Sequence, residues 1–336
     1  MRLVPVPPGL VRRPSPSLEE ARAFHQKFAP LGVRQCAVIR AAVLDERADP
    51  TGTTRVWLAY EHLQITGSFK VRGALLATSR AKKDGQGVVT ASAGNHGAGI
   101  AFAAHHLGVS ATVVVPATAP EKKKNRIAAF GAKLIEISGS YDDAEDHAKE
   151  LARASGSRFV SAYDDEQVVI GNGASLGFEI TLALGGIPDV VLAPFGGGGL
   201  STGLAWAFAE DAGEALGASR RVYGVQSEVS PVMAKSLVDG RAIERFTPRT
   251  RTHAEGLEGG ISQAAFERAR SAIGGVLVVE EFSIASAMAL ALNELGQVIE
   301  GSAATALVPV AEGLPTALRG GDVLCVVTGR NVDRAG

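Results

Sequence analysis

The sequence is poor in the residues that build disulfide scaffolds, metal clusters and polyanion-binding surfaces. Only two cysteines occur among 336 residues, Cys36 and Cys325, and both stand in apolar surroundings (QCAVI and VLCVV). This usage indicates buried thiols and a reducing compartment. The net charge is -1, and no Lys/Arg-rich block is interleaved with aromatic residues. Composition therefore gives no electrostatic case for a nucleic-acid or anionic-membrane partner.

Long apolar runs are also missing. The N-terminal stretch MRLVPVPPGLVRRPSP is broken by prolines before a continuous apolar core develops, so it does not resemble a secretory signal. We find no apolar run of the roughly 18 residues that a membrane span needs. The chain is 46% hydrophobic and 21% charged, enough for a large core. We expect a cytoplasmic protein whose partner is a small molecule.

Short β-branched runs alternate with Ala-rich helical segments from about residue 87 onward. This rhythm predicts parallel sheets covered by helices, and hence the α/β class. The predicted strands lie at residues 88–90, 111–115, 133–137, 189–195, 221–226, 276–280 and 322–327. We expect two open, mostly parallel twisted sheets: a small domain at 85–163, and a large domain formed by 1–84 and 164–336, with a cleft between them.

Four consecutive glycines, Gly196, Gly197, Gly198 and Gly199, stand directly after a predicted strand and before a helix. Without Cβ atoms the backbone can turn its N–H groups inward, and the helix start adds about half a positive charge. The spacing fits neither the P-loop nor the Gly-x-Gly-x-x-Gly pattern, so a compact phosphomonoester fits better than a nucleotide. A plain strand-to-helix turn is the alternative, but one or two glycines usually suffice for it.

Lys70 follows a Thr-Gly-Ser turn and begins a helix whose Val71, Ala74 and Leu75 face inward. A lysine that enters a cleft is partly desolvated, which lowers its pKa and frees the neutral amine to form a Schiff base with an aldehyde. Taken alone, the pattern favours a surface lysine whose aliphatic stem covers the helix start.

The segment VVTASAGNHGAGIAFAAHHLG adds a second loop rich in small residues, with Ser92, Asn95 and His96 between a strand and a helix. Asn95 can donate a hydrogen bond to a phenolate oxygen, and the loop N–H groups can bind a carboxylate. A capping or packing role for His96 is favoured over proton transfer. His105 and His106 are interpreted as ordinary helix residues.

Four motifs, ITGSFKVRGA, TASAGNHGAGIA, FGGGGLSTG and VVTGRNVD, occur in an order and spacing that resemble the serine/threonine dehydratase family of fold-type II pyridoxal-phosphate enzymes. The likeness covers nearly all of the chain after residue 55. It implies a tryptophan synthase β-like fold, pyridoxal 5'-phosphate as cofactor, and a homodimer. The chain ends soon after Asn331, so we expect no C-terminal regulatory domain of the kind that feedback-controlled threonine dehydratases append.

The resemblance also implies roles for individual residues. Lys70 would be the cofactor-binding catalytic lysine, and Phe69 would pack under the ring. Asn95 would donate to the ring oxygen and Thr328 would meet the pyridine nitrogen, with Glu300 near that end of the site. The phosphate cradle would be Gly196, Gly197, Gly198 and Gly199, followed by Leu200. The loop that holds the substrate carboxylate would be Ser92, Ala93, Gly94, Asn95 and His96.

The resemblance implies β-elimination: dehydration and deamination of a small hydroxy amino acid such as L-threonine or L-serine to a 2-keto acid and ammonia. A β-replacement or threonine-synthase-like enzyme is the alternative, and a cofactor carrier without catalysis is a further one. Racemisation is disfavoured, because similar serine racemases carry a serine hydroxyl as the second base where this chain has Ala93.

Three departures from the family pattern concern the substrate and cation sites. Arg330 replaces the usual glycine and could contact the substrate, lower the basicity of the ring nitrogen or point to solvent. Gln226 and Pro231 replace the two acidic ligands with which some relatives bind a divalent cation, so we expect no metal site. The usual Thr-Pro-Leu segment is replaced by CAVIRAAVLDE at 36–46.

Overall fold

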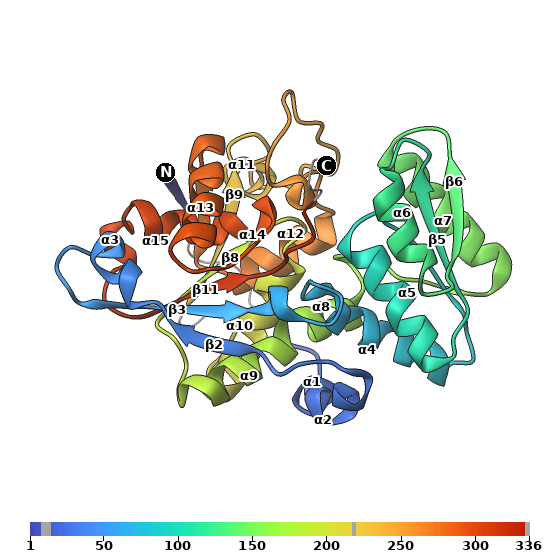
Figure 1. The fold of residues 1–336 in the computed structure, drawn as a ribbon, viewed down its shortest axis with the longest axis horizontal. Helices are drawn as coiled ribbons and strands as arrows, with labels where there is room; N and C mark the ends of the chain where they lie inside the picture. Colours follow the sequence, from blue (N-terminus) through green and yellow to red (C-terminus); the bar gives the residue numbers. More distant parts are fainter. Residues whose placement is uncertain (8–14, 217–219, 333–336) are drawn as a thin grey trace.

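The computed structural model describes residues 1–7, 15–216 and 220–332. Part of the N-terminal proline-rich stretch, and Asp333 at the end of the VVTGRNVD motif, lie outside the described residues. The chain forms two sheets, a seven-stranded sheet of order β1-β10-β9-β8-β11-β3-β2 and a four-stranded sheet of order β6-β5-β4-β7. The smaller sheet and its helices lie to the right in Figure 1. Two sheets of mostly parallel strands were predicted, and this is confirmed.

All seven predicted strands are present, and four others were missed. The large sheet consists of β1 (Arg2–Pro5), β2 (Ala37–Arg40), β3 (Thr54–Tyr60), β8 (Val190–Pro194), β9 (Val222–Ser227), β10 (Gly275–Val279) and β11 (Gly321–Val327). The small sheet consists of β4 (Val88–Ala91), β5 (Ala111–Pro116), β6 (Lys133–Ile137) and β7 (Arg158–Phe159). The edge strands β1 and β2 pair antiparallel with their neighbours, and the other pairs are parallel.

Burial explains why some strands are easy to recognise. Strands β8 and β10 are buried along their whole length, so they appear in the sequence as continuous apolar runs. The missed strands β1, β2 and β7 have only two to four residues each. Strand β3 is longer, but it precedes the alternating rhythm that begins near residue 87, so that rhythm does not reveal it.

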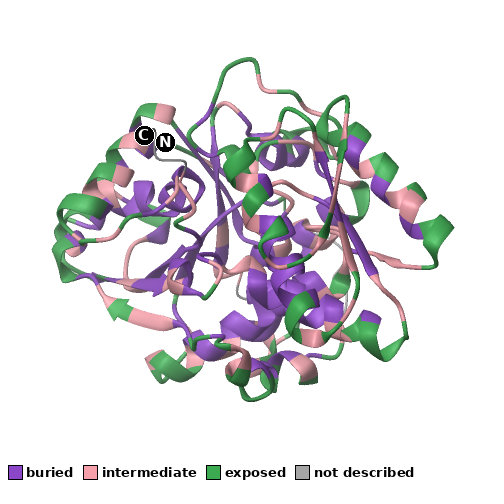
Figure 2. Cartoon of the chain, turned by 45° about the vertical axis from the view of Figure 1, so that its right-hand side comes forward, coloured by how far each residue is buried: buried purple, intermediate pink, exposed green. Residues whose placement is uncertain are grey.

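Helices cover both sheets. The main ones are α4 (Lys70–Lys83), α5 (Asn95–Leu107), α6 (Glu121–Ala128), α7 (Tyr141–Ser155), α9 (Ser175–Leu184), α10 (Gly199–Asp211), α11 (Val232–Asp239), α12 (Gln263–Ala272) and α13 (Glu281–Asn293). Short helices are α1 (Glu19–Arg22), α2 (Phe24–Phe28), α3 (Asp45–Ala48), α8 (Glu166–Val169), α14 (Gly301–Ala304), α15 (Val308–Glu312) and the π-helical turn η4 (Ile170–Ala174). Figure 2 shows the buried residues concentrated in the strands and in the helices between the sheets.

The small sheet illustrates how strand periodicity assigns its two faces. Val113 and Val115 of β5 pack with helices α5 and α6, whereas Val114 between them packs with α7. Alternate residues of a strand point to opposite faces, so one valine run serves two cores. Helix α4 packs along α5, and its buried face belongs to the same core as residues of α9 and α10. Helix α4 therefore connects the layers of the two sheets.

One expectation about apolar segments is wrong. The continuous helical stretch Glu166–Leu184 is long and apolar enough to cross a membrane by length and composition. However, 67% of its apolar window is buried inside the protein. The apolar surface of this stretch is therefore covered largely by the protein's own core, as in the central helix of a globular domain.

Glycines allow the central helices to approach closely. A Cβ on Gly203 of α10 would lie 2.4 Å from the carbonyl oxygen of Val169 and 2.7 Å from Cα of Gly173. Both contacts are with backbone that cannot move independently of its helix. The glycine at position 203 therefore fixes how closely α10 packs against the π-helical turn.

We predict that Gly203→Ala destabilises the protein by about 1–3 kcal/mol or more, because the added methyl must push two backbones apart. Chemical denaturation followed by circular dichroism measures the change. Gly186→Ala is the matched control, since a Cβ there meets nothing within 4 Å, and it should alter stability by less than about 1 kcal/mol. Equal stability of the two variants would contradict the packing argument.

Candidate functional site

The turn before Lys70 lies beside the segment that follows β11, although some 260 residues separate them in the chain. Ser68 and Gly329 form an antiparallel bridge. The N–H of Phe69 donates to the carbonyl of Thr328 at 3.0 Å, and the N–H of Arg330 donates to the carbonyl of Gly67 at 3.0 Å. The structure thus brings the predicted Lys70 and Thr328 segments together.

The Lys70 amine contacts the segment Ala162–Tyr163, which packs on the glycine loop. Its Nζ donates to the carbonyl of Ala162 at 3.3 Å and lies 5.1 Å from the ring centroid of Phe69. The next residue, Tyr163, packs so closely on the glycine loop that a Cβ on Gly197 would be 2.4 Å from the Tyr163 Cβ. Lys70 therefore contacts the residue that precedes the tyrosine packed on the glycine loop.

Burial lowers the pKa of Lys70 to about 8, although the nearby Glu300 charge opposes this shift. Desolvation penalises the ammonium form and is the larger of the two effects. At a pH near 8 about half of the Lys70 side chains are then neutral amines. A desolvated lysine of this kind can act as a nucleophilic amine.

The glycine loop joins β8 to α10, whose first residue is Gly199. Gly198 has φ +81°, in the left-handed region that glycine adopts without strain. Leu200 is buried in the first helical turn, where the leading N–H groups have no partner within the helix. The hydroxyls of Ser201 and Thr202 are buried without a hydrogen-bond partner among the described residues. This end of α10 is thus rich in unused donors.

The second loop, before α5, contains a hydrogen bond of its own. Ser92 Oγ accepts a hydrogen bond from the N–H of Gly94 at 3.2 Å, and Ala93 is partly buried. Asn95 and His96 belong to the first turn of α5 rather than to the loop, which corrects the boundary expected from the sequence. Their side chains therefore have fixed directions along the helix.

His96 is a packing histidine. It is buried, and its Nε2 lies 3.2 Å from the carbonyl oxygen of Val160. Because a carbonyl only accepts, Nε2 carries the proton. Burial, with the positive charge of Lys70 as a smaller cause, lowers the pKa of His96 to about 3. His96 is therefore neutral at physiological pH, which favours the packing role given to it above.

Glu300 and Asn95 meet at the same place. The Asn95 amide nitrogen donates to both carboxylate oxygens of Glu300, at 2.9 and 3.1 Å. The N–H of Glu300 donates to the carbonyl of Gly329 at 3.0 Å, which places Glu300 next to the Thr328 segment. Burial raises the pKa of the Glu300 carboxyl, opposed by hydrogen bonds from Asn95 and Asn331.

Gln226 and Arg330, which depart from the family pattern, have the following contacts in the structure. Gln226 donates to the carbonyl of Phe195 at 3.2 Å and accepts from the N–H of Ala234 at 3.1 Å. Its side-chain amide therefore connects the residue before the glycine loop to helix α11. Arg330 is exposed and, with His62 and Lys122, lines a cavity of about 450 Å³. Within the described ranges, no group of three or more His, Cys, Asp or Glu side chains is placed to hold a metal ion.

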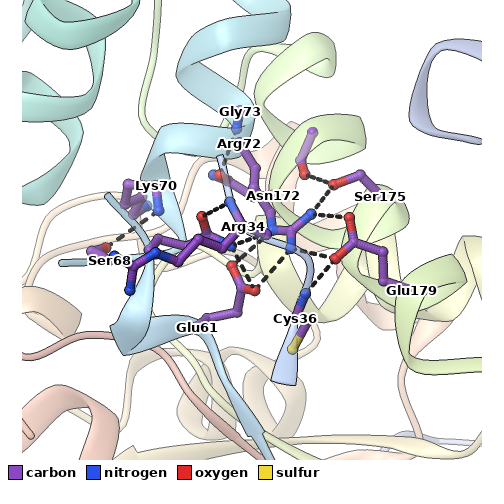
Figure 3. A network of polar contacts seen from close by, with 12 residues as sticks. Arg34, Cys36, Glu61, Ser68, Lys70, Arg72, Gly73, Asn172, Ser175 and Glu179 are labelled. Carbon is purple, nitrogen blue, oxygen red and sulfur yellow. Dashed lines mark hydrogen bonds and ion pairs between the residues drawn. The ribbon is translucent and has the colours of Figure 1, made fainter. Parts of the chain in front are cut away.

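Arg72, two residues after Lys70, is the centre of a buried ion cluster (Figure 3). Its guanidinium donates to both oxygens of Glu61, at 2.7 and 2.9 Å, and to both oxygens of Glu179, at 2.9 and 2.7 Å. It also donates to the hydroxyl of Ser175 at 3.2 Å. Burial by itself would lower the pKa of Arg72, but the two carboxylates outweigh it and raise the pKa further.

The cluster ties three parts of the fold to the start of α4. Glu61 lies in the 3-10 turn after β3, and Glu179 lies on α9. Glu179 also accepts from the N–H of Cys36 at 2.7 Å, just before β2. Figure 3 shows Lys70 beside Ser68, to one side of the Arg72 guanidinium. This cluster was not predicted from the sequence. Arg72 stands among the apolar residues at the start of α4, and such a position could have indicated a buried, paired arginine.

The family described as "Pyridoxal-phosphate dependent enzyme" matches residues 31–329 of the chain. The chain belongs to this family. Its cofactor is pyridoxal phosphate.

Named relatives are similar over most of the chain. An L-threonine ammonia-lyase of Geobacter sulfurreducens is 35% identical over 285 residues, which are 83% of this chain and 67% of that protein. The crystal structure of a T.th. threonine deaminase has a TM-score of 0.82 at 33% identity and covers 96% of this chain and 100% of that one. Serine racemase from Dictyostelium discoideum has a TM-score of 0.81 at 26% identity, over 94% and 99% of the two chains.

The described residues fit the cofactor. A phosphate needs N–H and O–H donors, and the start of α10 offers buried hydroxyls at Ser201 and Thr202 that lack partners there. An aldehyde needs a neutral amine, which the lowered pKa of Lys70 provides. The contact between Ala162 and Lys70, next to the Tyr163 packing on Gly197, links the amine to the glycine loop through two consecutive residues.

We predict that covalent capture of pyridoxal phosphate by the apoprotein accelerates with rising pH, with a midpoint near 8. Only the neutral amine is nucleophilic, and the neutral fraction of Lys70 grows as the pH passes its pKa of about 8. Stopped-flow absorbance between roughly pH 6 and 10 measures the rate. A midpoint above about 10, typical of a solvated lysine, would contradict the desolvated site.

We predict that Arg72→Met destabilises the protein by about 3–5 kcal/mol, because two buried carboxylates lose their counter-charge. Urea unfolding measures the loss. Arg80→Met is the control on the same helix: the Arg80 side chain is 53% exposed and pairs with Asp84 at i+4, a contact worth about 0.3–0.5 kcal/mol. If both variants lost the same free energy of unfolding, the buried cluster would contribute no more to stability than an exposed ion pair.

Proposed function

We propose that this protein is a lyase that removes water and then ammonia from a small hydroxy amino acid such as L-threonine or L-serine, giving a 2-keto acid. The observation that carries the proposal is the partly neutral Lys70 amine, which contacts Ala162 next to the glycine loop's neighbour Tyr163 and follows the backbone bond between Phe69 and Thr328. The similarity to L-threonine ammonia-lyase of Geobacter sulfurreducens supports the substrate class.

The proposed cofactor contacts follow from these positions. Lys70 would bind the cofactor covalently, with Phe69 against the ring, Asn95 toward the ring oxygen, and Thr328 toward the ring nitrogen near Glu300. Gly196, Gly197, Gly198, Gly199 and Leu200 would hold the phosphate with their N–H groups. Pyridoxal phosphate supplies an electron sink that acidifies the α-hydrogen of an amino acid joined to it.

Backbone groups of this chain would bind the substrate, and one side chain would move a proton. The N–H groups of Ser92, Ala93, Gly94, Asn95 and His96 would bind the substrate carboxylate at the start of α5. Lys70 Nζ, once released, would take the α-proton, a task that suits an amine with a pKa of about 8. Thr328 presents a hydroxyl rather than a carboxylate, so the ring nitrogen gains no anionic partner there. This arrangement favours expulsion of the β-hydroxyl over transamination.

We also propose that residues 85–163 form a small, mobile substrate domain, and that residues 1–84 and 164–336 form the cofactor domain. The four-stranded sheet supports this division, because it has hydrophobic cores of its own on both faces. A cytoplasmic location is supported by Cys36 and Cys325, which are both free and buried. A homodimer is expected from the family resemblance.

We predict that Lys70→Ala abolishes the visible cofactor absorbance and lowers keto-acid release from L-threonine or L-serine by at least roughly 10²–10⁴-fold, the usual contribution of a general base. Keto acid is measured by coupled reduction. Lys83→Ala is the control, since Lys83 is on the same helix with its side chain 56% exposed. Full activity in Lys70→Ala with an unchanged circular dichroism spectrum would refute the assignment.

The same assay separates the alternatives. A β-replacement or threonine-synthase-like enzyme would release keto acid poorly until a nucleophile or a phosphorylated substrate is added. A racemase would produce the D-amino acid. Ala93 disfavours this outcome, since its methyl group carries no proton for an opposite-face transfer. A cofactor carrier would give neither product and at most a spectral shift.

A further inference from the structure

Asn331 connects three segments of the candidate site. Its side-chain nitrogen donates to the carbonyl of Thr66 at 3.0 Å and to the side-chain oxygen of Asn95 at 2.6 Å. Its backbone N–H donates to a carboxylate oxygen of Glu300 at 3.1 Å. One residue thus links the turn before Lys70, the start of α5 and the start of α14.

These contacts determine which way the Asn95 amide points. The carbonyl of Thr66 can only accept, so the Asn331 atom facing it is the nitrogen. That nitrogen also faces Asn95, which must therefore present its oxygen. The Asn95 nitrogen is then directed to Glu300. A reversed Asn95 amide would set nitrogen against nitrogen and a carbonyl against a carboxylate, losing both interactions.

The backbone around Asn331 leaves little room for another arrangement. A Cβ on Gly67 would lie 2.5 Å from the side-chain oxygen of Asn331, and Gly67 has φ +75°. A Cβ on Gly329 would lie 2.4 Å from a carboxylate oxygen of Glu300. The missing Cβ atoms at Gly67 and Gly329 therefore make room for the Asn331 and Glu300 side chains beside the backbone.

We propose that Asn331 is a positioning residue: by binding the Asn95 amide oxygen it keeps the Asn95 nitrogen on the opposite side, where one N–H faces the Glu300 carboxylate and the second is left for the cofactor ring oxygen. The inference rests on the proposed contact between Asn95 and the ring. Asn331 acts through Asn95 and Glu300 and supplies no group to the reacting atoms. Because Asn95 lies on α5 beside the small sheet and Asn331 follows β11 of the large sheet, the contact also joins the two proposed domains.

The charges around this contact affect any pH titration of the bound cofactor. Glu300 is the carboxylate within hydrogen-bond distance of Asn95. The positive charges of Arg126 and Lys123 on α6 act on Glu300, and Glu300 in turn acts on Lys70. A comparison between variants must therefore include a control of equal charge.

The test uses the holoenzyme and two variants at position 331. Asn331→Leu removes both side-chain donors, and Asn331→Asp replaces them with an acceptor that favours the reversed Asn95 amide. An N–H donated to the ring oxygen stabilises its anionic form. Without it, the pH midpoint of the visible absorbance change should rise by about one unit, and the cofactor dissociation constant should increase about tenfold. The shift should be larger in Asn331→Asp than in Asn331→Leu.

Two controls show whether the effect passes through Asn95. Asn293→Asp adds the same charge at an exposed position at the end of α13 and should leave the spectrum unchanged. In an Asn95→Ala background, Asn331→Leu should cause no further spectral shift, because the residue that it positions is gone. Additive shifts, or variants that lower only the melting temperature, would overturn the proposal.

These readouts do not depend on substrate turnover. If the wild-type protein releases no keto acid from hydroxy amino acids, the proposed function fails, while the spectral comparison still decides the role of Asn331.

Discussion

The arrangement of the site depends on the buried charge of Arg72. Its guanidinium is completely shielded from water and meets two carboxylates from different parts of the fold, Glu61 and Glu179. An isolated charge in such a place would be very costly, so each of these groups is tolerable only while the others hold their positions. The start of α4 is thereby fixed to the turn after β3 and to α9, and Lys70 is the first residue of that helix.

The start of α4 carries two basic side chains whose pKa values shift in opposite directions. Arg72 is surrounded by carboxylate oxygens, which raise its pKa and keep it permanently charged. Lys70 is likewise desolvated, but its contact is a carbonyl oxygen and Glu300 acts on it only as a weaker, opposing influence, so its pKa falls to about 8. Burial is common to both residues, and the number of close carboxylates decides the outcome. A structural cation and a nucleophilic amine can therefore stand two residues apart.

Backbone proximity is the second condition for the site. Helices α4 and α10, which begin at Lys70 and Gly199, both pack against the π-helical turn Ile170–Ala174. Glycines in these elements let backbones approach to distances that a side chain would prevent. The starts of α4 and α10 are consequently held against the same turn of the chain. The hydroxyls of Ser201 and Thr202 at the start of α10 are buried without a partner among the described residues.

Much of this protein was determined by local sequence. Continuous apolar runs predicted the interior strands β8 and β10, since such strands are buried on both faces. Four consecutive glycines indicated an anion site, because a backbone without Cβ atoms can turn several N–H groups toward one anion. The family motifs located Lys70 and Thr328. The short edge strands and the first turn of α5 were missed or misplaced because two to four residues carry too little periodic signal.

Only the tertiary structure decided which groups share an environment. The lowered pKa of Lys70 reflects burial among distant segments, with contacts to neighbours such as Ala162 and an opposing charge at Glu300. The direction of the Asn95 amide depends on Asn331, and the charge of Arg72 is balanced by Glu179 on another helix. Sequence periodicity reports which face of an element is buried, but hydrogen bonds and Coulomb interactions depend on distances of a few ångströms between elements. Those distances exist only after the sheets and helices have packed.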